Sequence, residues 1–121
     1  MNSIELENRL IDFAVAIFEL ISGLPGNQIN KILVDQLSRS ATSCALNYGE
    51  ARSAESNKDF IHKTKVILKE LRETYIGLRI LERIKALQEL HKLKEILNEN
   101  NELIAIFVTT VKTAQNNSNP K

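Results

Sequence analysis

The sequence predicts an all-α protein, an antiparallel up-down-up-down four-helix bundle. The chain of 121 residues is rich in Leu, Ile, Ala, Lys and Glu, with only four Gly, two Pro and no Trp. That composition favours helices over sandwiches or barrels, which need more turn residues and aromatics. Apolar residues recur at alternating steps of four and three in four separate segments, which is the spacing of a buried helix face. Four amphipathic helices joined by short loops pack as a bundle.

The first two helices are expected over residues 3–22 and 28–52. The run Gly23-Leu24-Pro25-Gly26-Asn27 separates them and has the residues that typically end a helix. The apolar stripe of the first helix is Leu6, Leu10, Phe13, Ile17, Leu20 and Leu24, and that of the second is Ile32, Leu33, Leu37, Ala41, Cys44 and Tyr48. Each stripe is wide enough to bury one face of its helix.

The third and fourth helices are expected over residues 57–85 and 89–114. Ser56 is a good N-cap, and Asp59 three residues later completes a pattern close to a capping box. Asn100 occupies a core-type position in the fourth helix. A buried Asn at such a position usually fixes helix register or partner choice at some cost in stability.

The chain length allows one domain, expected over residues 1–115, with the polar residues 116–121 as a disordered tail. The N-terminus lacks the basic region of a signal peptide, and the longest apolar run, residues 13–18, is too short to span a bilayer. The lone Cys44 lies among small apolar residues and is expected to be a buried, inert thiol. These features predict a cytoplasmic protein with no membrane role.

The formal net charge of +1 hides an uneven distribution of charges. Residues 1–24 contain four acids and one base, which gives −3, whereas residues 57–85 contain eight bases and four acids, which gives +4. The first predicted helix is therefore acidic and the third is basic. Such opposite charges either bring the two helices together or give an assembly oppositely charged faces.

A stripe of polar residues runs along the second predicted helix, where a helix that only packs would be apolar. Its members follow steps of four and three and so share one helix face; they are Gln36, Ser40, Ser43, Asn47 and Glu50. We expect these residues to form a structural polar network with the third helix, in which Arg72 or Arg79 pairs with Glu50. A buried charge pair of this kind gives specificity more reliably than stability.

A basic stripe lies on one face of the third predicted helix. Its members are His62, Lys65, Lys69, Arg72, Arg79 and Arg83. Lys and Arg side chains about 5–6 Å apart on one helix face can follow a phosphate backbone. The alternatives are pairing within the helix, as between Lys69 and Glu73 or Arg79 and Glu82, and pairing with the acidic first helix of a neighbouring subunit. The sequence leaves nucleic-acid contact and subunit-bridging charge open as roles for this stripe.

The sequence predicts no enzyme, no cofactor and no metal site. A di-metal carboxylate bundle needs Glu-x-x-His motifs, whereas the only carboxylate-x-x-His here is Asp59-x-x-His62, and Asp59 is better explained as a helix cap. Four-helix ribonucleases of the HEPN type space an Arg and a His more closely than Arg83 and His91 are spaced here. No glycine-rich phosphate loop is present, nor a nucleophile beside a plausible base. His62 and His91 are expected on solvated helix faces.

Several short motifs lie in the second and third predicted helices and in the turn between them. They are Gln36-Leu37-x-Arg39-Ser40-x-x-Ser43, Asn47-x-x-Glu50-Ala51, Ala54-Glu55-Ser56, Asp59-Phe60-Ile61-His62-Lys63, Lys69-Glu70-x-Arg72-Glu73-Thr74 and Leu78-Arg79. Together they resemble the 23S rRNA intervening sequence protein family, also called S23-type. The resemblance spans residues 5–112, and its specific motifs lie within 36–80. A subgroup of that family often has Trp where this chain has Gly77.

The resemblance implies an antiparallel four-helix bundle that assembles as a ring-like homopentamer. Related bundles include the accessory proteins of diversity-generating retroelements, which are basic pentamers that bind a reverse transcriptase and RNA. The resemblance implies no established activity. Residues and resemblance together predict a non-enzymatic oligomeric bundle that contacts structured RNA or DNA, with rRNA among the candidates, through the basic stripe. The alternative is a protein–protein interaction scaffold with no nucleic-acid role.

Overall fold

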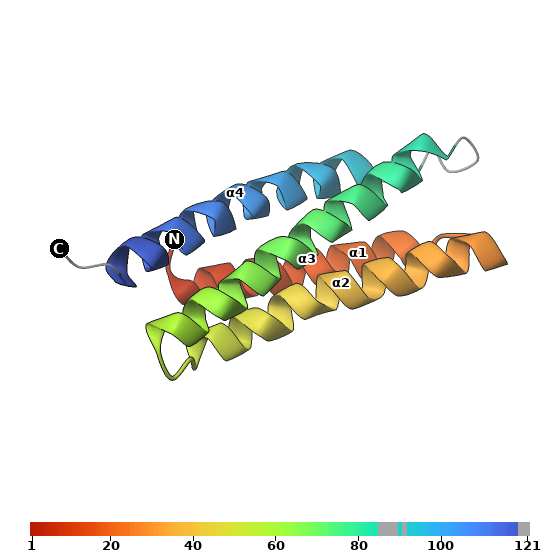
Figure 1. Ribbon diagram of the computed structural model, residues 1–121. Helices are drawn as coiled ribbons and strands as arrows, with labels where there is room; N and C mark the ends of the chain where they lie inside the picture. The colour runs from red at the N-terminus through yellow and green to blue at the C-terminus, as the bar shows by residue number, and fades with distance from the viewer. Residues whose placement is uncertain (85–89, 91, 119–121) are drawn as a thin grey trace.

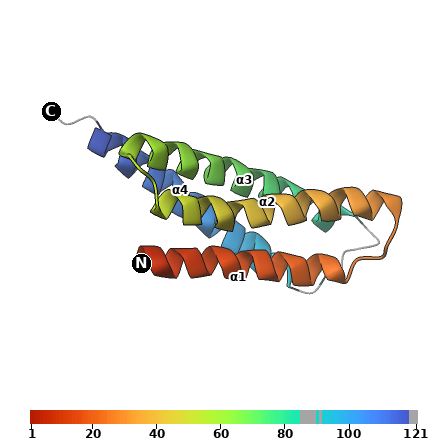
Figure 2. The same ribbon diagram turned by 90° about the horizontal axis from the view of Figure 1, so that it is seen from below.

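The computed structural model of the chain describes residues 1–84, 90 and 92–118. Within these residues there is no strand, and the elements are four helices: α1 (Ser3–Ser22), α2 (Gln28–Arg52), α3 (Asn57–Arg83) and α4 (Leu93–Ser118). Successive helices run in opposite directions, so the start of α1 and the end of α4 lie at the same end of the bundle (Figure 1, Figure 2). The predicted fold class, an all-α four-helix bundle, is confirmed.

Side chains at three helix starts bind backbone N–H groups that the first turn of a helix leaves free. In each case a side-chain oxygen accepts a hydrogen bond from the N–H three residues later. The pairs are Asn2 with Glu5, Asn27 with Asn30, and Ser56 with Asp59. The Ser56 cap predicted from the sequence therefore forms, and α3 begins at the next residue, Asn57.

The core runs the length of the bundle and is built from the apolar faces of all four helices. The largest side chains with almost no exposed surface include Phe13 of α1, Leu37 of α2, Leu71 of α3 and Phe107 of α4. Phe107 also meets Tyr48 of α2 edge to face, with ring centroids 5.6 Å apart. Because edge-to-face pairs are favourable beyond the area that they bury, this contact helps to fix two helices that are not sequence neighbours.

Helices α2 and α3 approach each other closely at Gly77. A Cβ atom at this position would lie 2.8 Å from Leu37 Cδ2, which is inside the van der Waals contact distance. Leu37 is fully buried, so it has little freedom to move aside. Gly77 therefore allows α2 and α3 to pack closely at this point.

The bounds of α4 differ from the predicted 89–114. The helix begins at Leu93, because Lys92 has a φ of 67°, in the left-handed region that a right-handed helix cannot include. It extends to Ser118, so residues 116–118 are helical and do not belong to a disordered tail. The Asn57 side chain donates a hydrogen bond to the Ala114 carbonyl oxygen at 2.8 Å and another to the Ser118 hydroxyl, which holds this last turn against α3.

The third helix ends two residues earlier than the predicted residue 85. It stops at Arg83, because its C-cap Ile84 has an extended backbone with φ −76° and ψ 112°. Two other predictions, the short connection after the third helix and the solvated position of His91, fall outside the described residues.

Candidate functional site

Glu70 of α3 is the one charged residue that is buried in the described part of the chain, and it faces α2. Its side chain is 9% exposed, and its Oε2 lies 3.0 Å from Arg39 Nη1. The other terminal nitrogen of Arg39 donates to Glu73, also at 3.0 Å. The hydrogen bond to Glu73 and the nearby charge of Glu70 raise the pKa of the Arg39 guanidinium. One arginine of α2 thus joins two carboxylates of α3.

An uncharged contact between the same two helices lies beside this ion pair. The Thr74 hydroxyl donates to Ser40 Oγ at 2.8 Å, and both side chains are fully buried. One turn further along α2, the Cys44 thiol donates to the Ser40 carbonyl oxygen at 3.3 Å. Burial raises the pKa of Cys44 from 9.0 to about 12. The predicted burial of the Cys44 thiol is therefore confirmed.

The members of the predicted polar stripe on α2 have different surroundings. Ser40 contacts α3 as described, and Glu50 accepts a hydrogen bond from Lys63 Nζ of α3 at 2.9 Å. Asn47 donates instead within its own helix, to the Ser43 hydroxyl and carbonyl oxygens, both at 2.9 Å. Gln36 is exposed to solvent.

The predicted pairing of Glu50 with Arg72 or Arg79 is wrong. Lys63, which takes that role, is seven residues from Glu70 and so lies on the side of α3 that faces α2. Arg72 and Arg79 belong to the opposite, outer side of the helix. Periodicity correctly placed the two arginines on one face, but it did not show which way that face points.

The basic stripe of α3 faces solvent, and we call it the basic face. His62, Lys65, Lys69, Arg72 and Arg83 are exposed, and Arg79 is partly covered, with its guanidinium carbon 5.9 Å from the centre of the Tyr75 ring. Across the described residues, the ion pairs involve Arg9, Lys31, Arg39, Arg52 and Lys63 as cations, and no member of the basic face. The pairs of Lys69 with Glu73 and of Arg79 with Glu82 do not form.

Two large apolar side chains, Ile76 and Ile80, lie on the basic face and are each close to half exposed. Our sequence interpretation did not single them out. The signal was present, because they follow Arg72 at steps of four and fall outside the four-three core stripe of α3. The C-terminal half of the basic face is therefore both apolar and charged, whereas the part from His62 to Lys69 is more uniformly charged.

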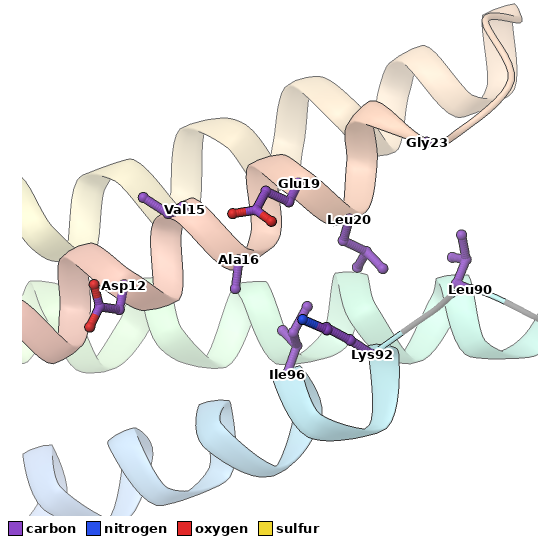
Figure 3. Close-up of a pocket in the computed structure, with 9 residues that line it drawn as sticks. All are labelled: Asp12, Val15, Ala16, Glu19, Leu20, Gly23, Leu90, Lys92 and Ile96. Atoms are coloured by element: carbon purple, nitrogen blue, oxygen red, sulfur yellow. The ribbon is translucent and has the colours of Figure 1, made fainter.

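A second surface with exposed apolar residues lies on α1, and we call it the acidic face. Ile4, Ile11, Val15 and Phe18 share this side of the helix and are each about half exposed. Asp12 and Glu19 are exposed beside them. Both carboxylates also line a cavity of about 510 Å³ between α1 and the start of α4, into which Lys92 extends from the α4 side (Figure 3).

The described residues contain no cluster of three or more His, Cys, Asp or Glu side chains placed to hold a metal ion. None of their helices is long and apolar enough to cross a membrane. His62 lies exposed on α3, as expected.

A sequence model of the 23S rRNA-intervening sequence protein family matches residues 3–109. The chain belongs to this family. A solved structure from the S23 ribosomal protein family, a protein of unknown function from Bacteroides thetaiotaomicron, is 30% identical and superposes with a TM-score of 0.81. The alignment covers 93% of this chain and 99% of that one. No curated protein sequence matches this chain.

The structure gives a physical role to several motif residues that resemble those of the 23S rRNA-intervening sequence protein family. Arg39, Ser40, Glu70, Glu73 and Thr74 meet in the contacts between α2 and α3. These residues therefore hold the two helices together in a set orientation.

Proposed function

We propose that this member of the 23S rRNA-intervening sequence protein family is a non-enzymatic, oligomeric scaffold that binds structured RNA or DNA through the basic face of α3. The observation that carries this proposal is a row of exposed cations that no carboxylate of the described chain neutralises. Unpaired cations on one rigid helix are suited to phosphate groups, since binding releases the counterions that phosphates hold. The name of the family makes ribosomal RNA the first nucleic acid to test.

The spacing of the cations limits how strongly one chain can bind. The part of the basic face from His62 to Lys69 spans seven residue steps, or about 10 Å of helix. A row of that length reaches about three phosphates, which gives weak binding for one chain. Several copies that present the same row would bind far more tightly through multivalency. Oligomerisation is therefore part of the proposed function.

The second candidate is a protein–protein scaffold with no nucleic-acid role. Ile76 and Ile80 favour it, because exposed aliphatic side chains gain nothing from a phosphate backbone but pack well in a protein interface. A non-enzymatic role in the reducing cytoplasm fits both candidates, since the single thiol, Cys44, is buried and held in its protonated form.

The deciding experiment measures binding of labelled 23S rRNA fragments by fluorescence anisotropy at about 50 mM and about 200 mM salt. For three phosphate contacts, affinity should fall about 40-fold over this range, using the slope for duplex DNA. The variant Lys65→Glu/Lys69→Glu should lose binding. The control Lys94→Glu/Lys112→Glu, with the same change in net charge on exposed positions of α4, should retain it. Salt-insensitive binding, no binding, or equal loss in both variants would overturn the proposal.

A further inference from the structure

We infer that the acidic face of α1 binds the C-terminal half of the basic face of α3 in a second copy of the chain, with the two helices parallel. This inference rests on the proposed function, because it identifies the contact that makes the scaffold oligomeric. It also leaves His62, Lys65 and Lys69 free for nucleic acid. Three features of the two faces lead to it.

The first feature is that both faces have a stripe of exposed apolar residues. On α1, the residues Ile11, Val15 and Phe18 follow steps of four and three, and on α3, Ile76 and Ile80 are four apart. In coiled-coil terms, Ile11 and Ile76 occupy d positions, and Val15 and Ile80 occupy the following a positions. Two such stripes cover each other when the helices pack side by side.

The second feature is a match in the spacing of charges. Asp12 and Glu19 lie seven residues apart along one edge of the α1 stripe, and Arg72 and Arg79 lie seven residues apart along one edge of the α3 stripe. Each spacing corresponds to two helical turns, or about 10 Å. Both carboxylates can therefore meet both guanidinium groups in a single register.

The third feature fixes the direction of the helices. With the apolar residues at a and d, the two acids of α1 occupy e positions and the two arginines of α3 occupy g positions. In paired helices, e and g residues of opposite charge form ion pairs that set orientation. Contacts between e and g arise in parallel pairs, whereas antiparallel pairs bring e to e and g to g. The register pairs Arg72 with Asp12 and Arg79 with Glu19, and places Ile76 against Ile11.

Charge also excludes the two symmetric alternatives. Two α1 faces packed antiparallel would bring Asp12 and Glu19 of one copy against the same acids of the other, and two α3 faces would bring arginines together.

The charge match between the acidic face and the basic face weakens toward the start of α1, where the Glu5 carboxylate already accepts a hydrogen bond from the Asn2 side chain at 3.2 Å. In this register Glu73, which already pairs with Arg39, lies opposite Asn8. The apolar contact therefore ends at Ile11 and Ile76, before it reaches Lys69.

The geometry of the bundle allows one copy to use both faces at once. Helices α1 and α3 are not sequence neighbours and run in the same direction within the chain (Figure 1, Figure 2). A parallel contact of α1 with α3 of the next copy keeps successive bundles pointing in the same direction. Such a head-to-tail contact closes into a ring if its rotation allows, and it presents every basic row in the same orientation.

The test uses two charge-reversed variants, Asp12→Arg/Glu19→Arg and Arg72→Glu/Arg79→Glu, and sedimentation velocity. The wild-type chain should sediment well above the monomer mass of 13.7 kDa. Each variant alone should be a folded monomer, because one face now repels its partner. An equal mixture should regain assemblies larger than a monomer in which the two variants alternate, since both kinds of contact are again complementary. The control Lys94→Glu/Lys112→Glu should assemble like wild type.

A wild-type monomer, two variants that still assemble, or a mixture of folded variants that stays monomeric would each overturn the inference. Cysteine cross-linking then tests the register. In a Cys44→Ala background, Ile11→Cys with Ile76→Cys should form an intermolecular disulfide on oxidation, whereas Ile4→Cys with Ile76→Cys should not. The reverse result would contradict the parallel register. Variants that still assemble, beside a wild-type chain that assembles and binds RNA, count against this contact alone. A wild-type chain that assembles through this contact but shows no salt-sensitive RNA binding counts against the proposed function alone.

Discussion

Replacing Arg39 by Met should destabilise the bundle by about 2 kcal/mol. Met keeps most of the aliphatic stem but removes the donors that bind Glu70 and Glu73, so a carboxylate that is only 9% exposed loses its charged partner. Removing one member of a buried ion pair costs about 3–5 kcal/mol. Arg39 is itself 52% exposed, and solvent screening reduces that cost to about 2 kcal/mol.

Urea unfolding followed by far-UV circular dichroism measures this effect. For a chain of this size, 2 kcal/mol lowers the midpoint by roughly 1–2 M urea. The double variant Arg39→Met/Glu70→Met should recover to within about 1 kcal/mol of wild type, because replacing both partners leaves no buried charge. Lys31→Met is the matched control. It breaks an exposed pair with Asp35 and should cost less than about 0.5 kcal/mol.

The reasoning fails if Arg39→Met shifts the midpoint no more than Lys31→Met does. It also fails if the double variant is no more stable than Arg39→Met, because the cost would then not come from the unpaired Glu70 carboxylate.

Three further predictions concern other polar side chains at contacts within the bundle. Asn100 is fully buried. Its Nδ2 donates to the Leu71 carbonyl oxygen at 3.0 Å, whereas its Oδ1 has no partner among the described residues. Asn100→Leu should therefore raise the free energy of unfolding by about 1 kcal/mol and the thermal midpoint by a few degrees. Arg9 forms two hydrogen bonds of 2.7 Å with Glu99 of α4, so Arg9→Met should cost about 1 kcal/mol and speed hydrogen exchange in α1 more than in α3. Burial raises the pKa of Cys44 from 9.0 to about 12, so the thiol stabilises the fold fully below pH 9 and this contribution is lost as pH rises toward 12. The stability advantage of wild type over Cys44→Ala should therefore shrink by about 2 kcal/mol between about pH 8 and about pH 10.5, and a constant difference in urea midpoints would contradict the burial.

Features that depend on local sequence could be predicted. The start of α3 follows from Ser56, whose hydroxyl binds a backbone N–H three residues away, and the fold class follows from the four-three spacing of apolar residues. The end of α4 could not be predicted in this way. Residues 116–118 have the composition of a coil, and they are helical where Asn57, far away in sequence, binds the last turn.

The same distinction applies to the candidate site. Periodicity placed the basic residues on one face of α3, because that requires only the helical repeat. It could not show how α3 is rotated against α2, and so it paired Glu50 with the wrong cations. Arg39 and Glu70 both belong to the motifs found in the sequence. Their contact could not be predicted, because it joins two helices whose packing depends on Gly77 and Ser40.

Some polar residues of the motifs lie between the helices, and others lie on the outside of the bundle. This difference limits what the motifs indicate about function. Arg39 and Glu70 pair with each other and hold α2 against α3, so these side chains are not available to an outside ligand. The guanidinium groups of Arg72 and Arg79 form no ion pair in the described chain, so they can still pair with an outside partner. Chains that share the motifs should therefore share the packing of α2 on α3, while their partners depend on the outer faces of α1 and α3. We therefore propose to look for an activity of this chain first on those two faces, where exposed apolar and charged side chains lie together.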